Sequence, residues 1–335
     1  MIRRIFPIIA FFLAGSIAQA QVHGVDVEVN EGKLVPTVAQ LQTLINPNDI
    51  VRDVLGWHLV DLKCNLSANP SATIAIPTQM SMLYANVQAA GARNFVTLAF
   101  NNTHCGQLSN SGGKTFPDTN ALRAEFAAYA AAVVRQVPAL AGVSLWNEMN
   151  GTFTGGYATT AERLTNYCLL ANQVIGAIRA VDSKIPIAIG ATVGAGIDTW
   201  FIGMFDTYGC MGKGDPTIWL DVHPYLSGMV VKAIRKTDFN EWNDSIANIR
   251  GDNISNPLIA TEWGSSAAFR FLQANPNDNY ITTFETKVSA HDKAWAALSW
   301  FPWKDDLKAP NSGLLDRSGT ILTTFGLEYT AAFKQ

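Results

Sequence analysis

Charged residues are scarce in this chain of 335 residues, and this scarcity already excludes some classes of protein. Charged residues make up 15% of the sequence and hydrophobic residues 48%. This is the composition of a globular protein with a large core, and it excludes a disordered chain. The formal net charge is −3. The lack of a basic excess argues against nucleic acid and anionic membranes as partners.

Several common motifs are also missing. The four cysteines include no Cys-x-x-Cys pair and no Cys/His cluster with zinc spacing. Nothing else in the sequence indicates a catalytic metal or an organic cofactor, so we expect neither. No Gly-x-Gly-x-x-Gly turn follows the first strand-like segment, which removes the commonest support for a dinucleotide-binding open sheet. Linkers, low-complexity tracts and repeats are absent, and we therefore expect one domain.

The first twenty residues have the pattern of an export signal. Arg3 and Arg4 precede an apolar run from Ile5 to Gly15, and small residues at 18–20 form a cleavage site. The apolar run is too short to span a bilayer comfortably. We predict a signal peptide at 1–20 and a secreted or periplasmic protein that is not inserted in a membrane. Loss of the two arginines would move the net charge from −3 to −5.

Hydrophobic runs alternate with amphipathic segments through residues 21–335. The runs predict strands at 23–29, 55–62, 94–100, 141–147, 185–191, 218–225, 257–262 and 296–301. The segments between them predict helices near 36–46, 77–90, 118–136, 158–181, 197–208, 239–250, 278–292 and 322–334. Continuous apolar runs are typical of strands that are covered on both faces. The alternation predicts an α/β fold with a single (β/α)8 TIM barrel at 21–335, and the main alternative is a doubly wound open sheet.

Two of the strand-like runs end in a glutamate, Glu148 and Glu262. Burial of an unpaired charge costs several kcal/mol, so such a residue has either a salt-bridge partner or a chemical role. In a barrel both would lie at the carboxyl ends of strands four and seven and face the same mouth. Hydrolysis of a glycosidic bond needs two such carboxyl groups, one as acid and one as base or nucleophile. Two structural ion pairs are the alternative.

The residues around both glutamates resemble clan A glycoside hydrolases, most closely families 39 and 5. Trp146-Asn147-Glu148 resembles the clan's acid/base motif at the end of strand four, and Thr261-Glu262-Trp263-Gly264 resembles its nucleophile motif at the end of strand seven. His223-Pro224-Tyr225 is similar to the clan's His-x-Tyr on strand six. Trp300 stands on strand eight, where the clan often places an aromatic floor for the reactive sugar.

This resemblance implies a retaining double displacement. Glu262 would attack the anomeric carbon, and Glu148 would first donate and then accept a proton. The pKa of Glu148 must then lie above that of Glu262 and fall once the glycosyl-enzyme forms. Asn147 would bind the sugar 2-hydroxyl, Tyr225 would hold the nucleophile, and His223 would line the same wall, although a core histidine is nearly as good an interpretation.

Other predicted substrate contacts rest on position alone. Trp263, Trp300 and Trp303 flank the proposed mouth, where aromatic faces stack on sugars, and Asn101 and His104 follow the third strand. One feature of the clan has no clean counterpart. Its arginine on strand two is matched neither by Arg52, which precedes the expected strand, nor by Lys63, which follows it.

The cysteine layout favours two disulfides, Cys64–Cys105 and Cys168–Cys210, with free thiols as the alternative. We predict a monomeric, exported, retaining β-glycosidase that cleaves a polysaccharide or oligosaccharide. Endo-action is favoured because a pocket closed at one end generally needs extra loops or an added domain. The alternatives are an exo-acting β-glycosidase, a transglycosylase with the same residues, and a non-catalytic carbohydrate-binding barrel.

Overall fold

A computed structural model describes most of the chain after the predicted signal peptide, which lies outside the described residues. The described residues are 22–29, 34–107, 115–150, 157, 159–193, 196–226, 232–265, 280–287, 292, 295–305 and 313–334.

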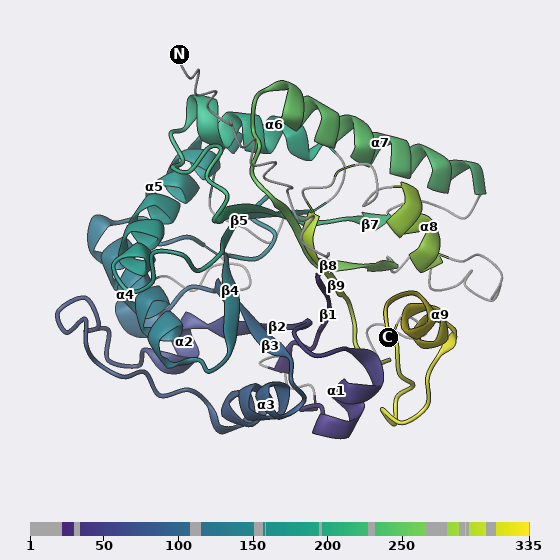
Figure 1. Ribbon diagram of the computed structural model, residues 1–335. Coiled ribbons are helices and arrows are strands. Elements are labelled where there is room, and N and C mark those ends of the chain that lie inside the picture. Colours follow the sequence, from purple (N-terminus) through teal and green to yellow (C-terminus); the bar gives the residue numbers. More distant parts are fainter. Residues whose placement is uncertain are drawn as a thin grey trace, which may run out of the picture.

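Eight parallel strands form a closed barrel surrounded by helices (Figure 1). The strands are β1 (Val22–Asp26), β2 (Ile50–Gly56), β3 (Arg93–Ala99), β4 (Leu140–Leu145), β5 (Ile187–Val193), β6 (Ile218–His223), β8 (Leu258–Ser265) and β9 (Trp295–Trp300). Each pairs with the next, β6 pairs with β8, and β9 closes the ring against β1. A two-residue strand, β7 (Tyr225–Leu226), adds to the end of β8. The predicted TIM barrel is confirmed.

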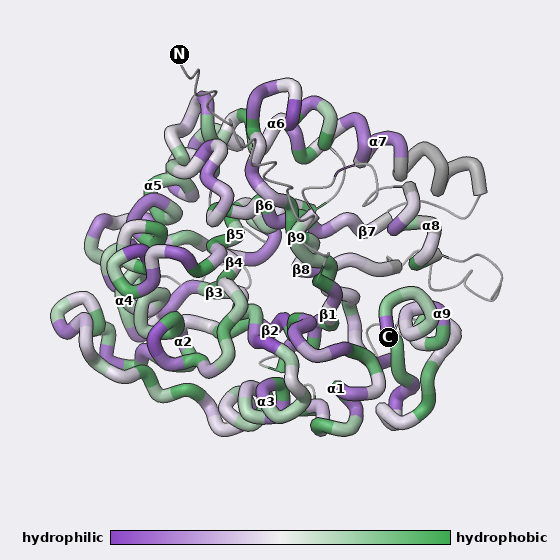
Figure 2. The backbone as a smooth tube through the Cα atoms, in the orientation of Figure 1, coloured by the Kyte–Doolittle hydropathy of each residue, from purple (hydrophilic) through white to green (hydrophobic). Residues whose placement is uncertain are grey.

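The helices follow the expected alternation. They are α1 (Val38–Leu44), α2 (Trp57–Val60), α3 (Thr78–Ala89), α4 (Asn120–Gln136), α5 (Thr160–Arg179), α6 (Ile197–Ile202), α7 (Lys232–Gly251), α8 (Tyr280–Lys287) and α9 (Thr324–Phe333), with a 3-10 turn at Thr103–Cys105 and a π-helical turn at Gly203–Thr207. Among the described residues, each helix is too short or too polar to span a bilayer. The backbone is hydrophobic at β8 and β9 in the centre and hydrophilic along much of α7 at the periphery (Figure 2).

The inside of the barrel has an apolar layer and a polar layer. A small cluster fills the amino-terminal end: Ile50, Phe95, Ala141, Ala188, Ile259 and Ala297. Side chains two positions apart on a strand point to the same face. Arg52, Thr97 and Thr261 therefore continue the interior of β2, β3 and β8 toward the carboxyl ends, and all three are buried. The polar layer thus lies at the end where a barrel carries its active site.

The second strand lies earlier than predicted. We expected it at 55–62, but β2 covers Ile50–Gly56 and residues 57–60 form α2. The prediction missed the start of this strand because Arg52 and Asp53 interrupt its apolar run. Both side chains are buried, because Arg52 has acidic partners inside the barrel and Asp53 accepts the backbone N–H of Val29 at 2.8 Å.

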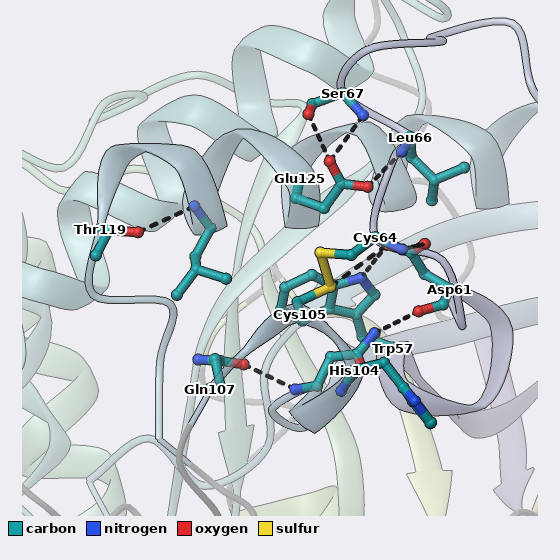
Figure 3. The surroundings of a disulfide bond; sticks show 12 residues. Trp57, Asp61, Cys64, Leu66, Ser67, His104, Cys105, Gln107, Thr119 and Glu125 are labelled. Carbon is teal, nitrogen blue, oxygen red and sulfur yellow. Dashed lines mark hydrogen bonds between the residues drawn. A yellow bond between two sulfur atoms is a disulfide. The ribbon is translucent and has the colours of Figure 1, made fainter.

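Both predicted disulfides, Cys64–Cys105 and Cys168–Cys210, are present. The first joins the segments that follow β2 and β3, beyond the carboxyl ends of these strands (Figure 3). Asp61 supports it by accepting the backbone N–H of Cys64 and the indole N–H of Trp57, each at 2.9 Å. The bridge therefore braces two neighbouring loops at the mouth of the barrel.

Candidate active site

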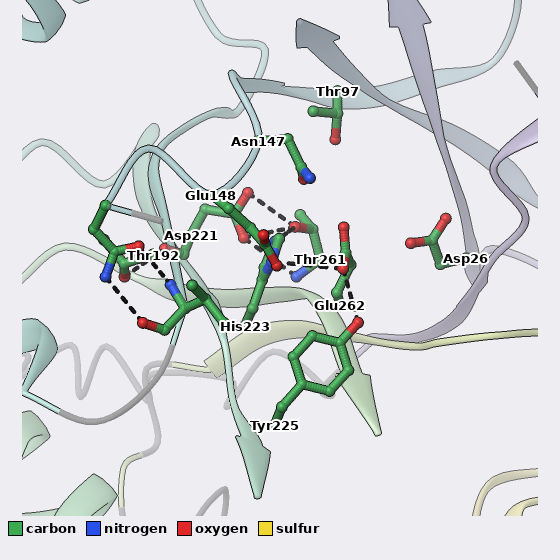
Figure 4. A network of polar contacts seen from close by, with 12 residues as sticks. Asp26, Thr97, Asn147, Glu148, Thr192, Asp221, His223, Tyr225, Thr261 and Glu262 are labelled. Carbon is green, nitrogen blue, oxygen red and sulfur yellow. Dashed lines mark hydrogen bonds and ion pairs between the residues drawn. The ribbon is translucent and has the colours of Figure 1, made fainter. Parts of the chain in front are cut away.

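Glu148 and Glu262 meet at the carboxyl end of the barrel, as their positions predicted (Figure 4). Oxygen atoms of the two carboxylates and a ring nitrogen of His223 all lie within 4.8 Å of one another. Glu262 stands on β8, whereas Glu148 follows β4 on a turn in which Trp146 and Glu148 have φ values of 71° and 48°. Non-glycine residues rarely adopt this left-handed conformation. The turn redirects the chain and places the Glu148 carboxylate opposite β8.

Each oxygen of Glu262 has a partner. Nη1 of Arg52 lies 2.7 Å from Oε1, and the Tyr225 hydroxyl donates to Oε2 at 2.7 Å. Burial on its own raises the pKa of this carboxyl group, but the positive charges of His223 and Arg52 and the hydrogen bond from Tyr225 outweigh it and lower the pKa to about 2. Glu262 is therefore ionised at any ordinary pH.

Arg52 is the residue that the sequence did not place correctly. It lies on strand two and reaches the nucleophile candidate, so the missing arginine of the clan pattern is present after all. Its Nη1 also contacts Asp26, its Nε donates to Thr97 at 2.9 Å, and its Nη2 donates to Asn147 at 2.7 Å. The sequence could have indicated this position. If a strand begins at Ile50 with that side chain inside the barrel, the residue two positions later, Arg52, also points inside.

His223 lies between the two glutamates. Its Nδ1 is 3.5 Å from Oε1 of Glu148 and 3.6 Å from Oε2 of Glu262, and its Nε2 is 3.0 Å from Oγ1 of Thr261. Burial lowers the pKa of the ring, but the charge of Glu262, the hydrogen bond to Glu148 and the charge of Asp221 raise it, and the net direction is upward. The carboxylates around the histidine thus favour its protonated form.

Three sets of side chains in the described part of the chain are close enough to hold a metal ion. One of them, Asp61/Cys64/Cys105, contains the disulfide cysteines, and the other two, Glu148/His223/Glu262 and Asp26/Glu28/Glu262, lie at the mouth. Arg52 supplies the last of these with positive charge, since its Nη1 contacts Asp26 and Glu262 and lies 3.6 Å from Glu28. The imidazole of His223 has the same effect in the other set at the mouth. We assign no metal to any of the three.

The three predicted tryptophans lie in the core rather than along an open cleft. Trp263 and Trp300 are fully buried and Trp303 is 1% exposed. Trp263 stacks on Phe284 of α8 at 4.5 Å between ring centroids and meets Trp300 edge-on at 4.8 Å. The pairing of β8 with β9 shifts register between Ala260 and Trp263, which breaks strict alternation. Thr261 and Glu262 both contact the polar layer, whereas Trp263 packs against α8. None of these rings offers a solvent-exposed face for a sugar.

The two predicted substrate contacts after β3, Asn101 and His104, differ in their exposure to solvent. Asn101 is buried, whereas His104 is exposed on the 3-10 turn that contains Cys105. Besides burial, the charge of His104 lowers the pKa of His58. Asn102 anchors this turn, since its side chain accepts the His104 N–H at 2.9 Å and donates to the Asp61 carbonyl at 2.7 Å.

No protein-family model matches the sequence, and no curated protein matches it. The chain is similar in structure to a family 39 glycoside hydrolase from the gut symbiont Bacteroides cellulosilyticus WH2, with 19% identity and a TM-score of 0.62 over 92% of this chain and 62% of that one. A family 39 β-xylosidase from Caulobacter crescentus gives 18% identity and a TM-score of 0.66, over 93% and 70%. The exo-β-1,4-mannosidase Op5Man5 from Opitutaceae bacterium strain TAV5 gives 16% and 0.58, over 93% and 59%.

The chain spans about 60 to 70% of the length of these three proteins. At such low identity, the likeness establishes the fold. It confirms, at that level, the resemblance to the family 39 glycoside hydrolases of clan A.

Proposed function

We propose that the protein is an exported, retaining β-glycosidase. One observation carries the proposal: carboxylate oxygens of Glu148 and Glu262 lie within 4.8 Å of each other at the mouth of the barrel. Retaining enzymes hold their two carboxyl groups about 5–5.5 Å apart, whereas inverting enzymes leave about 6.5–9.5 Å for a water molecule. The separation supports a covalent glycosyl-enzyme intermediate.

The different surroundings of the two glutamates support different roles. Glu262 is held ionised by Arg52 and oriented by Tyr225, which suits a nucleophile. Glu148 is more exposed, with 15% of its side chain accessible against 6% for Glu262, and one of its oxygens lies 3.5 Å from Nδ1 of His223. We assign it the acid/base role, in which it protonates the leaving oxygen and then activates water.

Asn147 fits the role of binding the sugar 2-hydroxyl. Its Oδ1 accepts from Arg52 at 2.7 Å, so its Nδ2 is the atom that donates to a substrate oxygen. Substrate contacts of Asn101 and His104 stay predictions. The two disulfides support export, because disulfides persist in oxidising compartments.

For the mode of action, we propose endo-cleavage of a polysaccharide by a monomer. Exo-action is the second candidate, favoured by the names of the structural neighbours, a β-xylosidase and an exo-β-1,4-mannosidase. Product analysis separates the two: endo-cleavage gives oligosaccharides of several lengths and a rapid fall in viscosity, whereas exo-cleavage releases single sugars. Products longer than the substrate identify a transglycosylase.

The decisive test uses a panel of aryl β-glycosides and β-linked polysaccharides. We expect proton NMR to show the β-anomer as the first product, and Glu262→Gln to lose at least about a thousandfold in kcat. With azide, Glu262→Ala should yield an α-glycosyl azide and Glu148→Ala a β-glycosyl azide.

Glu125→Gln is the matched control, because Glu125 is buried outside the glutamate network, where it accepts the backbone N–H of Ser67 at 2.9 Å. A first product of inverted configuration would refute the proposal, and no cleavage of any substrate would favour a carbohydrate-binding barrel.

A further inference from the structure

A line of polar side chains runs from the interior of the barrel to the glutamate pair (Figure 4). It begins at Asp221, which lies on β6 two residues before His223 and is fully buried. Oγ1 of Thr261 lies 2.8 and 2.9 Å from the two oxygens of Asp221, and the Ser144 hydroxyl donates to the same carboxylate. Its hydrogen bonds lead to the glutamates through Thr261 and His223, and its charge also acts on Arg52.

The hydrogen bonds in this line fix the direction of each proton. Asp221 receives the hydroxyls of Ser144 and Thr261 and the backbone N–H of Thr261 at 3.3 Å, and three donors suit an ionised carboxylate, which only accepts. Thr261 has a single hydroxyl proton and gives it to Asp221. Its oxygen must then accept from Nε2 of His223, 3.0 Å away. Nε2 therefore carries a proton.

With Nε2 occupied, Nδ1 is the ring atom that gains or loses a proton. It faces Oε1 of Glu148 at 3.5 Å and Oε2 of Glu262 at 3.6 Å. Two arrangements suit this geometry. In one, an imidazolium lies beside an ionised Glu148. In the other, the Nδ1–H bond has broken and an O–H bond has formed on Glu148, which leaves a neutral ring and a neutral acid.

We propose that Asp221 is a positioning residue which, through Thr261, fixes the tautomer of His223 and so leaves Nδ1 to share the acid proton with Glu148. This inference rests on the proposed role of Glu148. In this arrangement His223 can hold the proton that Glu148 donates. Asp221, which is buried away from the substrate, then controls the protonation state of the His223–Glu148 pair.

The charges around His223 give the expected direction of the effect. Carboxylates face the ring from three sides: Glu148 after β4, Glu262 on β8 and Asp221 on β6 itself. Tyr225 meets the ring edge-on at 6.3 Å and donates to Glu262, and Arg52 lies beyond Glu262. Burial lowers the pKa of His223, and the three carboxylates more than offset it. Removal of the Asp221 charge should therefore let the pair lose its proton at lower pH.

The first experiment measures the pH dependence of kcat/KM in the full chain. We expect Asp221→Asn and Thr261→Val to move the basic limb of the profile to lower pH by about one unit. Thr261→Ser keeps the hydroxyl and should keep the limb in place, as should Ser144→Ala, which removes a donor to Asp221 but leaves the Thr261 contact. If Asp221→Asn and Thr261→Val fold normally and their basic limbs do not move, Asp221 is only structural and the proposal is wrong.

The second experiment needs no substrate. In protein labelled with 15N-histidine, the ring signals of His223 are assigned among the five histidines by their loss in His223→Gln. We expect the neutral ring to carry its proton on Nε2 in the wild type, and this tautomer to be lost in Thr261→Val but kept in Thr261→Ser. A neutral wild-type ring protonated on Nδ1 would overturn the inference whatever the activity. Conversely, the Nε2–H tautomer in a protein that cleaves no glycoside would refute the proposed function alone.

Discussion

Glu262 is a buried carboxylate whose charge is stabilised from two directions. Arg52 approaches one oxygen and the Tyr225 hydroxyl the other, each at 2.7 Å, while His223 adds positive charge from the side of Glu148. Glu148 lies beside His223 and is more exposed. Such different surroundings are what an acid and a nucleophile within one site require.

The Tyr225 hydroxyl should matter for both rate and pH dependence. In Tyr225→Phe, Glu262 loses a hydrogen bond to its charged form, and hydrogen bonds to charged groups contribute about 1.5–3 kcal/mol. We expect kcat/KM to fall about 10- to 100-fold and the acidic limb of its pH profile to move to higher pH, because the loss raises the pKa of Glu262. Steady-state kinetics from pH 8 down to about pH 2, where the wild-type Glu262 pKa lies, would measure both effects.

Tyr329→Phe is the matched control for this change. Tyr329 is a buried core residue. Its hydroxyl donates at 2.9 Å to the carbonyl of Gly24, which belongs to β1 and not to the glutamate pair. Its loss should lower Tm without moving either limb. Equal shifts in the two variants would show that Tyr225 acts only through general stability.

Non-glycine residues with left-handed φ follow three strands at their carboxyl ends, β1 (Glu28, 43°), β3 (Phe100, 72°) and β4 (Trp146, 71°, and Glu148, 48°), and Ala191 (28°) lies within β5. Others, such as Ala139 (49°), precede a strand. Such conformations cost about 1–3 kcal/mol each and persist where the surroundings impose them. The residues Trp146 and Glu148 bear directly on the site, because the turn they form carries the Glu148 carboxylate.

The sequence located most strands because their apolar runs are continuous, and it failed where a strand carries buried charge. The partners that make Arg52 tolerable, Asp26 and Glu262, come from β1 and β8, and no local window contains all three. The tryptophans were misplaced for another reason. A register shift in β8 between Ala260 and Trp263 lets Glu262 face the mouth while Trp263 packs against α8, and an apolar run does not reveal such an irregularity.

The two disulfides offer a test of which loops shape the mouth. They close loops of nearly equal length, with separations of 41 and 42 residues, so loss of either bridge by paired Cys→Ser changes should cost about 4 kcal/mol in the chain-entropy account. Only Cys64–Cys105 joins the segments after β2 and β3. We expect its removal to raise KM several-fold, and removal of Cys168–Cys210, which links α5 to the segment before β6, to leave KM unchanged. Unfolding in urea and steady-state kinetics would check this, and equal KM values in both variants would contradict it.

The barrel interior combines an apolar layer with a charged one. Arg52 is completely buried together with Asp26, and burial of ion pairs is often no more stabilising than a hydrophobic core of the same volume. The charged layer is therefore better explained by the chemistry at the mouth than by stability. It also makes folding depend on pH, because carboxylates ionised inside the barrel must be protonated when the chain unfolds in acid.

Glu262 should account for a measurable part of that dependence. Its pKa is about 2 in the folded protein against an ordinary value of 4.5, so its ionised form contributes stability that is fully present above about pH 4.5 and is lost as the pH falls toward 2. Between pH 5 and 2 the wild type should lose roughly 3 kcal/mol more than Glu262→Gln, which has no group to titrate there. Tyr225→Phe should fall between them, since it lacks one of the hydrogen bonds that lower the pKa. Reversible urea unfolding at several pH values would measure the free energies, and parallel pH dependence in wild type and Glu262→Gln would show that the buried charge network does not hold Glu262 ionised.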